Sequence, residues 1–193
     1  MLRVQGRPER IQGQTWVYGL SEVHFRQGQV WRYNNFDGSL NIRLEAGGEN
    51  DSPGFVALGS TPEDVLRTHG TPTRVEKDRW FYGYSEIRFK DGLVAGYDNY
   101  FGNLNVRLLP SARSDGPASD EKPRPVFFTI GSTPDEVLGV QGTPTGIQGN
   151  LWTYNLASFY FRDGKVNYVL NSDGGLRFLA PDEVAAAGSN PGP

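Results

Sequence analysis

The chain of 193 residues has no cysteine and only two histidines. Without cysteine it can form no disulfide bond, no thiolate metal site and no cysteine nucleophile. No apolar run reaches the ~18 residues that a membrane-spanning helix needs, so no membrane span is expected. The net charge is −3 and the 19 basic residues are scattered, which argues against nucleic acid as a partner.

Turn-forming and aromatic residues are abundant instead. The chain has 25 glycines and 13 prolines, and 12% of its residues are aromatic. Frequent glycine and proline favour short strands and turns over long helices. With 37% hydrophobic residues the chain can build a core, so wholesale disorder is not expected.

One stretch is written almost twice. GSTPEDVLRTHGTPTRV at 59–75 returns as GSTPDEVLGVQGTPTGI at 131–147. Extending this alignment without gaps gives three copies of one sequence unit, and searching for such repeats comes first because missing one mis-assigns the fold. Matching positions are Trp16, Trp80 and Trp152; Tyr18, Tyr82 and Tyr154; Phe25, Phe89 and Phe161; Asn35, Asn99 and Asn171; Leu40, Leu104 and Leu176.

The first copy starts late in this alignment. Residues 1–3 align with residues 65–67, so the first copy has no counterpart of Phe55 to Asp64. We expect the chain to be a fragment or to begin inside an older repeat, and a targeting segment to be missing. The predicted organisation is a truncated first repeat (1–44), a linker (45–54), a second repeat (55–109), a linker (110–125), a third repeat (126–180) and a disordered tail (181–193).

Each repeat is expected to open with a short capped helix. Thr61 fits the N-cap, Pro62 the first helical position and Asp64 the acidic member of a capping box. Gly70 ends the helix. Thr133 opens the same pattern in the third copy.

Strands should follow the helix. Lys77 and Asp78 are expected in a turn, and Asp91-Gly92 is a strong signal for a two-residue hairpin. Alternating apolar residues predict further strands, the last one at 104–108. The predicted fold class is therefore α+β: three tandem repeats, each a short capped helix followed by an antiparallel meander of four to five strands, with the first repeat lacking its helix start.

No set of residues suited to catalysis recurs in the three copies. His24 aligns with Arg88 and Tyr160, and His69 aligns with glutamines, so neither position demands an imidazole base. No metal-binding or phosphate-loop motif is present. Gly59-Ser60-Thr61 could bind an anion at a helix start, but capping explains it better because Pro62 removes a backbone donor. The chain is predicted to be no enzyme and to need no cofactor or metal.

Aromatic residues at variable positions are the best candidates for a binding surface. Trp31 aligns with an alanine and an asparagine in the other copies. Phe36, Tyr100 and Phe101 lie near an expected loop. Aromatic side chains are enriched at interfaces, so we predict a partner-binding surface at these four residues; packing between repeats is the alternative.

The residues also resemble a known family. The motif GSTPEDVL, then GTPT, then Trp80-Phe81-Tyr82 and FKDGLV at 89–94 resembles the SmpA/OmlA-like superfamily. Its members include the small lipoprotein of the outer-membrane β-barrel assembly machine, and the β-lactamase inhibitor protein is similar in its tandem helix-plus-sheet units. This chain lacks their lipidated or disulfide-bonded cysteines. The resemblance implies the fold and a non-catalytic binding role, and it implies no particular functional residue.

Two functional hypotheses follow. The first is a non-enzymatic tandem-repeat module that binds or scaffolds an unknown protein partner at the cell envelope or after secretion. The alternative is a glycan or cell-wall binding module that uses exposed aromatic rings as stacking platforms.

Overall fold

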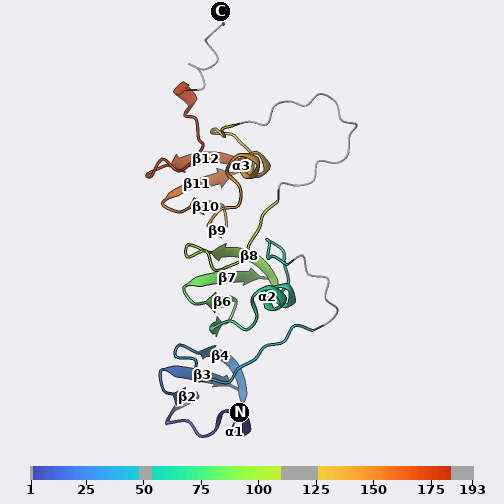
Figure 1. The fold of residues 1–193 in the computed structure, drawn as a ribbon, viewed down its shortest axis with the longest axis vertical. Coiled ribbons are helices and arrows are strands. Elements are labelled where there is room, and N and C mark those ends of the chain that lie inside the picture. Colours follow the sequence, from blue (N-terminus) through green and yellow to red (C-terminus); the bar gives the residue numbers. More distant parts are fainter. Residues whose placement is uncertain (1, 48–53, 110–125, 184–193) are drawn as a thin grey trace, which may run out of the picture. The chain divides into compact units, whose positions relative to one another are not determined.

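The computed structural model describes residues 2–47, 54–109 and 126–183 (Figure 1). The chain divides between Val106 and Arg107 into two compact units, which are described separately. The predicted linker at 110–125 and most of the predicted tail lie outside the described residues. None of the helices in the described ranges has the length and apolar character needed to cross a membrane.

Within its described residues, the first unit holds two helices and eight strands. These are α1 (Leu2–Gln5), β1 (Arg10–Gln12), β2 (Thr15–Tyr18), β3 (Ser21–Arg26), β4 (Gln29–Asn34), α2 (Pro62–His69), β5 (Arg74–Glu76), β6 (Arg79–Tyr82), β7 (Ser85–Lys90) and β8 (Leu93–Asp98). The second unit holds α3 (Pro134–Gln141), β9 (Gly146–Gln148), β10 (Leu151–Tyr154), β11 (Ala157–Arg162) and β12 (Lys165–Leu170).

The predicted fold class is wrong. In the described residues of each unit the strands form an antiparallel sheet in chain order, β1–β8 in the first unit and β9–β12 in the second, and helices are a minor part of both. Within the first unit β4 pairs with β5, with Arg32 opposite Glu76 and Asn34 opposite Arg74. The first and second copies are thus not separate helix-plus-meander units. The backbone groups at the edge of β4 find partners in the next copy, so the meander does not end where the sequence unit ends.

The expected last strand is also missing. Residues 104–108 form no strand, and in this stretch only Val106 makes an isolated parallel bridge, to Val56. Leu104 is buried and Val106 is half-buried. The alternation of apolar residues here therefore reflects burial of a loop against the core.

The predicted helix caps and the predicted Asp91-Gly92 hairpin turn are confirmed. Thr61 caps α2 and forms a capping box with Asp64, and Gly70 follows the helix with a φ of 70°. Thr133 caps α3 in the same way and forms a capping box with Glu136. The Asp91-Gly92 turn joins β7 to β8 with a φ of 53° at Asp91 and 79° at Gly92, the left-handed pair that a type I′ hairpin requires.

Both units bury apolar side chains on the inner face of their strands. In the first unit α2 lies beside β6–β8 and buries Val65 completely (Figure 1). In the second unit Phe159 is fully buried. Its ring lies near the rings of Phe128, Trp152, Tyr154 and Phe161. Because these apolar side chains lie on the inner face, the side chains that alternate with them point to the outer face of the strands.

Candidate binding surfaces

Three exposed aromatic residues gather at one end of the β6–β8 strands. Tyr84, Tyr100 and Phe101 are 84%, 56% and 64% exposed. The Phe101 ring centroid lies 5.3 Å from that of Tyr84 and 5.4 Å from that of Tyr100. We call these three residues the aromatic cluster. An exposed group of rings on a protein surface is typical of an interaction site.

Hydrogen bonds fix the two loops that carry the aromatic cluster. Asn99 in the loop after β8 donates from Nδ2 to the Leu104 carbonyl at 2.9 Å and accepts from the Leu104 amide at 2.8 Å. Asn103 donates to the Tyr82 carbonyl at 2.7 Å and accepts from the Ser85 hydroxyl, which ties this loop to the β6–β7 turn. The rings therefore stand on backbone that is held in place before any partner arrives.

The structure brings together only part of the predicted surface. Tyr100 and Phe101 are in contact, as members of one cluster. Trp31 on β4 is 45% exposed, and its ring lies 6.4 Å from that of His24. Phe36, in the loop after β4, is 73% exposed. In the described part of the chain, neither Trp31 nor Phe36 makes a ring contact with the aromatic cluster.

Tyr84 was missed by sequence reasoning. The available signal was its position directly after Gly83 in a tight turn, where an apolar side chain has nothing to pack against. Its counterparts Leu20 and Leu156 are also exposed. Phe101, by contrast, aligns with Asp37 and Asp173, so the full cluster belongs to the second copy alone.

The Asp37 carboxylate has a structural task in the corresponding loop of the first copy. It accepts hydrogen bonds from the Ser21 hydroxyl, from the Leu20 amide at 2.8 Å and from the Ser39 amide at 3.1 Å. These donors, the Ser21 hydroxyl foremost, hold the pKa of Asp37 well below its ordinary value. Hydrogen bonds to the Asp37 carboxylate thus hold this loop, at the position where the second copy has the ring of Phe101.

Charged side chains form a network on the outer face of β5–β7. Glu86 on β7 is 8% exposed and accepts hydrogen bonds from both Arg79 and Arg88. On β5, Arg74 lies 3.2 Å from Glu76, and its guanidinium stands 3.6 Å above the Phe81 ring. These contacts are mutual and satisfied, which marks them as a structural network.

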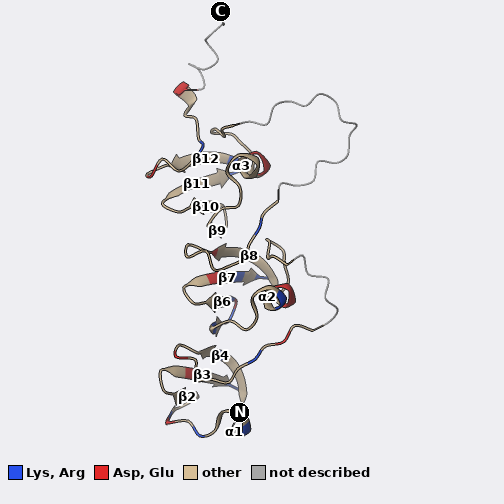
Figure 2. Cartoon of the chain, viewed as in Figure 1, with Lys and Arg blue, Asp and Glu red and all other residues tan. Residues whose placement is uncertain are grey.

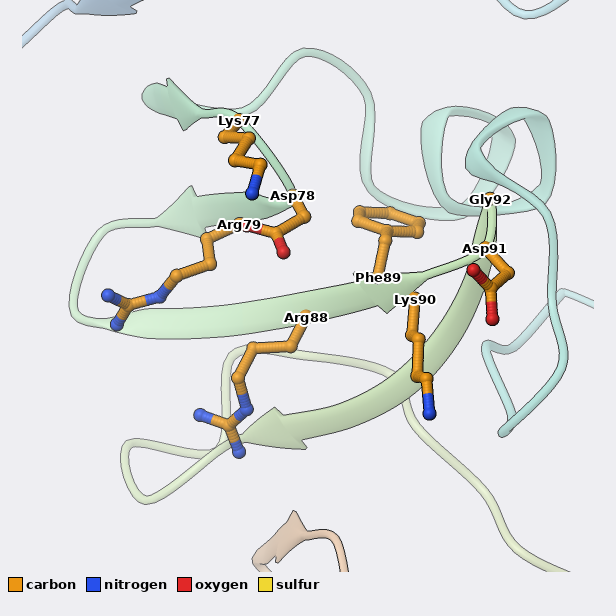
Figure 3. A pocket seen from close by; sticks show the side chains of 8 residues that line it. All are labelled: Lys77, Asp78, Arg79, Arg88, Phe89, Lys90, Asp91 and Gly92. Carbon is orange, nitrogen blue, oxygen red and sulfur yellow. The ribbon is translucent and has the colours of Figure 1, made fainter.

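A basic hollow opens at the other end of the same strands, between the β5–β6 turn and the β7–β8 turn (Figure 3). Its lining residues are Lys77, Asp78, Arg79, Arg88, Phe89, Lys90, Asp91 and Gly92. Four cationic side chains outnumber two carboxylates there, but Arg79 and Arg88 are engaged with Glu86. In Figure 3 the lysine and arginine head groups point in different directions, so the hollow has no convergent anion site.

The two histidines have structural surroundings. His24 contacts Glu22 at 3.0 Å and the Thr15 hydroxyl at 3.0 Å. His69, at the end of α2, lies against the Tyr82 ring, and burial lowers its pKa. The part of the chain that the structure describes holds no group of three or more acidic or histidine side chains arranged for a metal ion.

Comparison with protein-family models, with curated proteins and with solved structures finds no match.

Proposed function

We propose that the chain is a non-enzymatic binding or scaffold module whose partner is a protein, with the aromatic cluster as the contact surface. The resemblance to the SmpA/OmlA-like superfamily supports placing this role at the cell envelope.

The observation that carries the proposal is the combination of exposure and rigidity at the aromatic cluster. Tyr and Phe rings contribute large contact areas at small entropic cost and recur as anchors of protein interfaces. The hydrogen bonds of Asn99 and Asn103 hold the loops, so little ordering cost remains to be met on binding. Tyr84 and Tyr100 also carry hydroxyl groups, which can form hydrogen bonds with a partner.

The ring geometry favours a protein partner over a glycan. Phe101 is tilted by 38° to Tyr84 and by 82° to Tyr100. The rings therefore form a ridged surface, whereas sugar stacking uses a flat ring face that is fully open. Apolar side chains of a protein fit between tilted rings.

The test compares three immobilised proteins as bait for envelope proteins. These are the wild type, a variant with Tyr84→Ser, Tyr100→Ser and Phe101→Ser, and the control Leu156→Ser. Leu156 is the exposed counterpart of Tyr84 in the second unit. We expect a partner that the wild type and the control retain and the triple variant loses, as quantified by mass spectrometry.

Two outcomes would count against the proposal. A partner retained equally by the triple variant would show that the contact surface lies elsewhere. Retention on a glycan array that the triple variant loses, without any protein partner, would replace the protein by a glycan as the ligand.

A further inference from the structure

The first copy leaves open a part of its inner face that the other two copies cover. Val30 on β4 is 47% exposed, whereas its counterparts Val94 and Val166 are 2% and 1% exposed. Phe25 is half-buried, although the matching phenylalanines are buried. We call the surface formed by Trp16, Phe25, Val30 and Ile42 the open face. Trp16, Phe25 and Ile42 pack against the core of the first copy, and Val30 lies opposite Phe25 on the neighbouring strand.

In the other two copies an extended segment before the helix covers this place. It buries one apolar side chain, Val56 or Phe128, to 0% and 1% exposure. It also forms two backbone hydrogen bonds with the valine that matches Val30. These bonds are Gly59 N–H to Val94 C=O (2.8 Å), Val94 N–H to Ser60 C=O (2.9 Å), Gly131 N–H to Val166 C=O (2.7 Å) and Val166 N–H to Ser132 C=O (2.8 Å).

The same segment makes a parallel bridge at its start. Val56 pairs with Val106, and Phe128 pairs with Phe178. Val56 also donates its amide to the Asn105 carbonyl at 2.9 Å. By the sequence alignment, the first copy offers Ile42 and Asn41 at these positions.

The first copy therefore has the residues with which such an extended segment would pair, Val30, Asn41 and Ile42. Among the described residues no segment bridges to Ile42, and none forms the Gly-Ser type of backbone bond to Val30. The open face is thus an apolar surface that lies between the backbone groups of Val30 and Ile42. Such a surface is suited to an added extended polypeptide, because main-chain hydrogen bonds give affinity and side-chain contacts give specificity.

We propose that the open face binds an extended polypeptide segment with the chemistry of residues 54–64. The segment would place an apolar side chain at the position of Val56 and a Gly-Ser pair on the backbone of Val30. Its Thr-Pro and acidic residue would cap the helical turn α1, as Thr61 and Asp64 cap α2. This inference does not depend on the aromatic cluster, which lies in another copy and uses other residues.

The experiment uses the whole chain and a fluorescein-labelled synthetic peptide of residues 54–64, GFVALGSTPED. The peptide ends at Asp64 because the alignment places Met1 at the position of Val65. Fluorescence anisotropy should show saturable binding with one peptide per chain. At the second copy the tethered segment has an effective concentration in the ~mM range, so the free peptide should not displace it.

Matched variants locate the binding. Val30→Asp places a charge on the open face and should weaken binding at least ~tenfold, the loss that ~1.4 kcal/mol produces. Trp31→Ala changes the next residue, whose ring lies 6.4 Å from that of His24 and is not part of the open face, and should leave binding unchanged. A peptide with Val56→Asp should not bind the wild type, which tests the same contact without altering the protein.

Three results would overturn the proposal. The first is no saturable binding of the wild-type peptide. The second is binding that neither Val30→Asp nor the Val56→Asp peptide weakens. The third is a chain that sediments as a dimer and is not dissociated by the peptide, because a second copy would then occupy the surface in another way. Loss of aromatic-cluster binding in the envelope experiment would not affect any of these results.

Discussion

Strands β5–β8 and strands β9–β12 have the same lengths and the same pairing registers but different outer faces. Arg79 lies opposite Arg88 across β6 and β7, with Glu86 holding both. At the matching positions Leu151 lies opposite Tyr160. Figure 2 shows both charge colours on β7, whereas β11 is almost wholly tan. One backbone thus tolerates an ion network or an apolar surface on this side.

The shared features lie on the inner face and in the turns. A bulge occurs at the same place in each of the three long hairpins, just before Phe25, Phe89 and Phe161. Each of these phenylalanines donates its amide to the carbonyl of the turn residue that directly precedes the neighbouring strand, at 2.7–2.9 Å. A bulge bends and twists its strand. Inner-face packing and turn chemistry therefore set the register, while the outer face is free to vary.

The largest effect should follow from breaking the charge network. Glu86→Gln removes the carboxylate from between two guanidiniums and should lower the free energy of unfolding by ~2 kcal/mol, the range for hydrogen bonds to charged groups. Urea unfolding followed by tryptophan fluorescence measures this. The counterpart of Glu86 in the second unit is Ser158, which has no carboxylate, so no substitution there should have a comparable effect.

A triple variant sharpens the same comparison. Arg79→Leu, Glu86→Ser and Arg88→Tyr together copy the outer face of β10 and β11. This variant should recover most of the stability that Glu86→Gln loses, because replacing an ion network by apolar groups is often neutral. A triple variant less stable than the single one would show that the network also sets the register.

A smaller effect, of opposite sign, is expected at the end of α2. Gln5 and Gln141 each form two hydrogen bonds with the loop after the last strand of their copy. Gln5 donates to the Ser39 carbonyl and accepts from the Asn41 amide. Gln141 donates to the Gly175 carbonyl and accepts from the Arg177 amide. His69 stands at this position in α2, and its buried Nε2 has no hydrogen-bond partner among the described residues. His69→Gln should raise the free energy of unfolding by ~1 kcal/mol, and equal midpoints in urea would contradict this.

The same substitution should change the pH dependence of stability. Burial lowers the pKa of His69 below its ordinary value of 6.5, so the folded chain binds fewer protons there than the unfolded chain. The wild type should therefore lose stability as pH falls below about 6.5 and stay level above it. In His69→Gln this part of the slope should vanish, which unfolding curves between pH 5 and 8 can measure. A slope that persists in the variant would assign it to another group.

These contrasts also show which parts of the structure the sequence could predict. The helix caps and the Asp91-Gly92 turn depend on neighbouring residues, so local patterns were sufficient. The pairing of β4 with β5 joins strands separated by a helix and a long connection, and no local pattern encodes it. The same holds for the aromatic cluster: Tyr100 and Phe101 were found from their loop, but Tyr84 joins them only through folding.

The smallest effect should separate the two helix caps. Thr61 donates its hydroxyl to Asp64 at 2.8 Å while accepting from the Asp64 amide, and Arg67 pairs with the same carboxylate. Thr133 and Glu136 exchange only backbone-to-side-chain bonds, and the last turn of α3 has no basic residue. Thr61→Ala should cost about 1 kcal/mol and Thr133→Ala a few tenths less.

Acid should erase the difference between the caps. Hydrogen bonds from the Thr61 backbone and hydroxyl lower the pKa of Asp64 below its ordinary value of 3.8. The stabilisation that the carboxylate gives is therefore complete above that value and is lost as pH falls through the lowered pKa. Urea unfolding of both alanine variants at pH 7 and near pH 2.5 tests this. If the two variants differ as much in acid as at neutral pH, the extra stability of the first cap comes from packing rather than from the carboxylate.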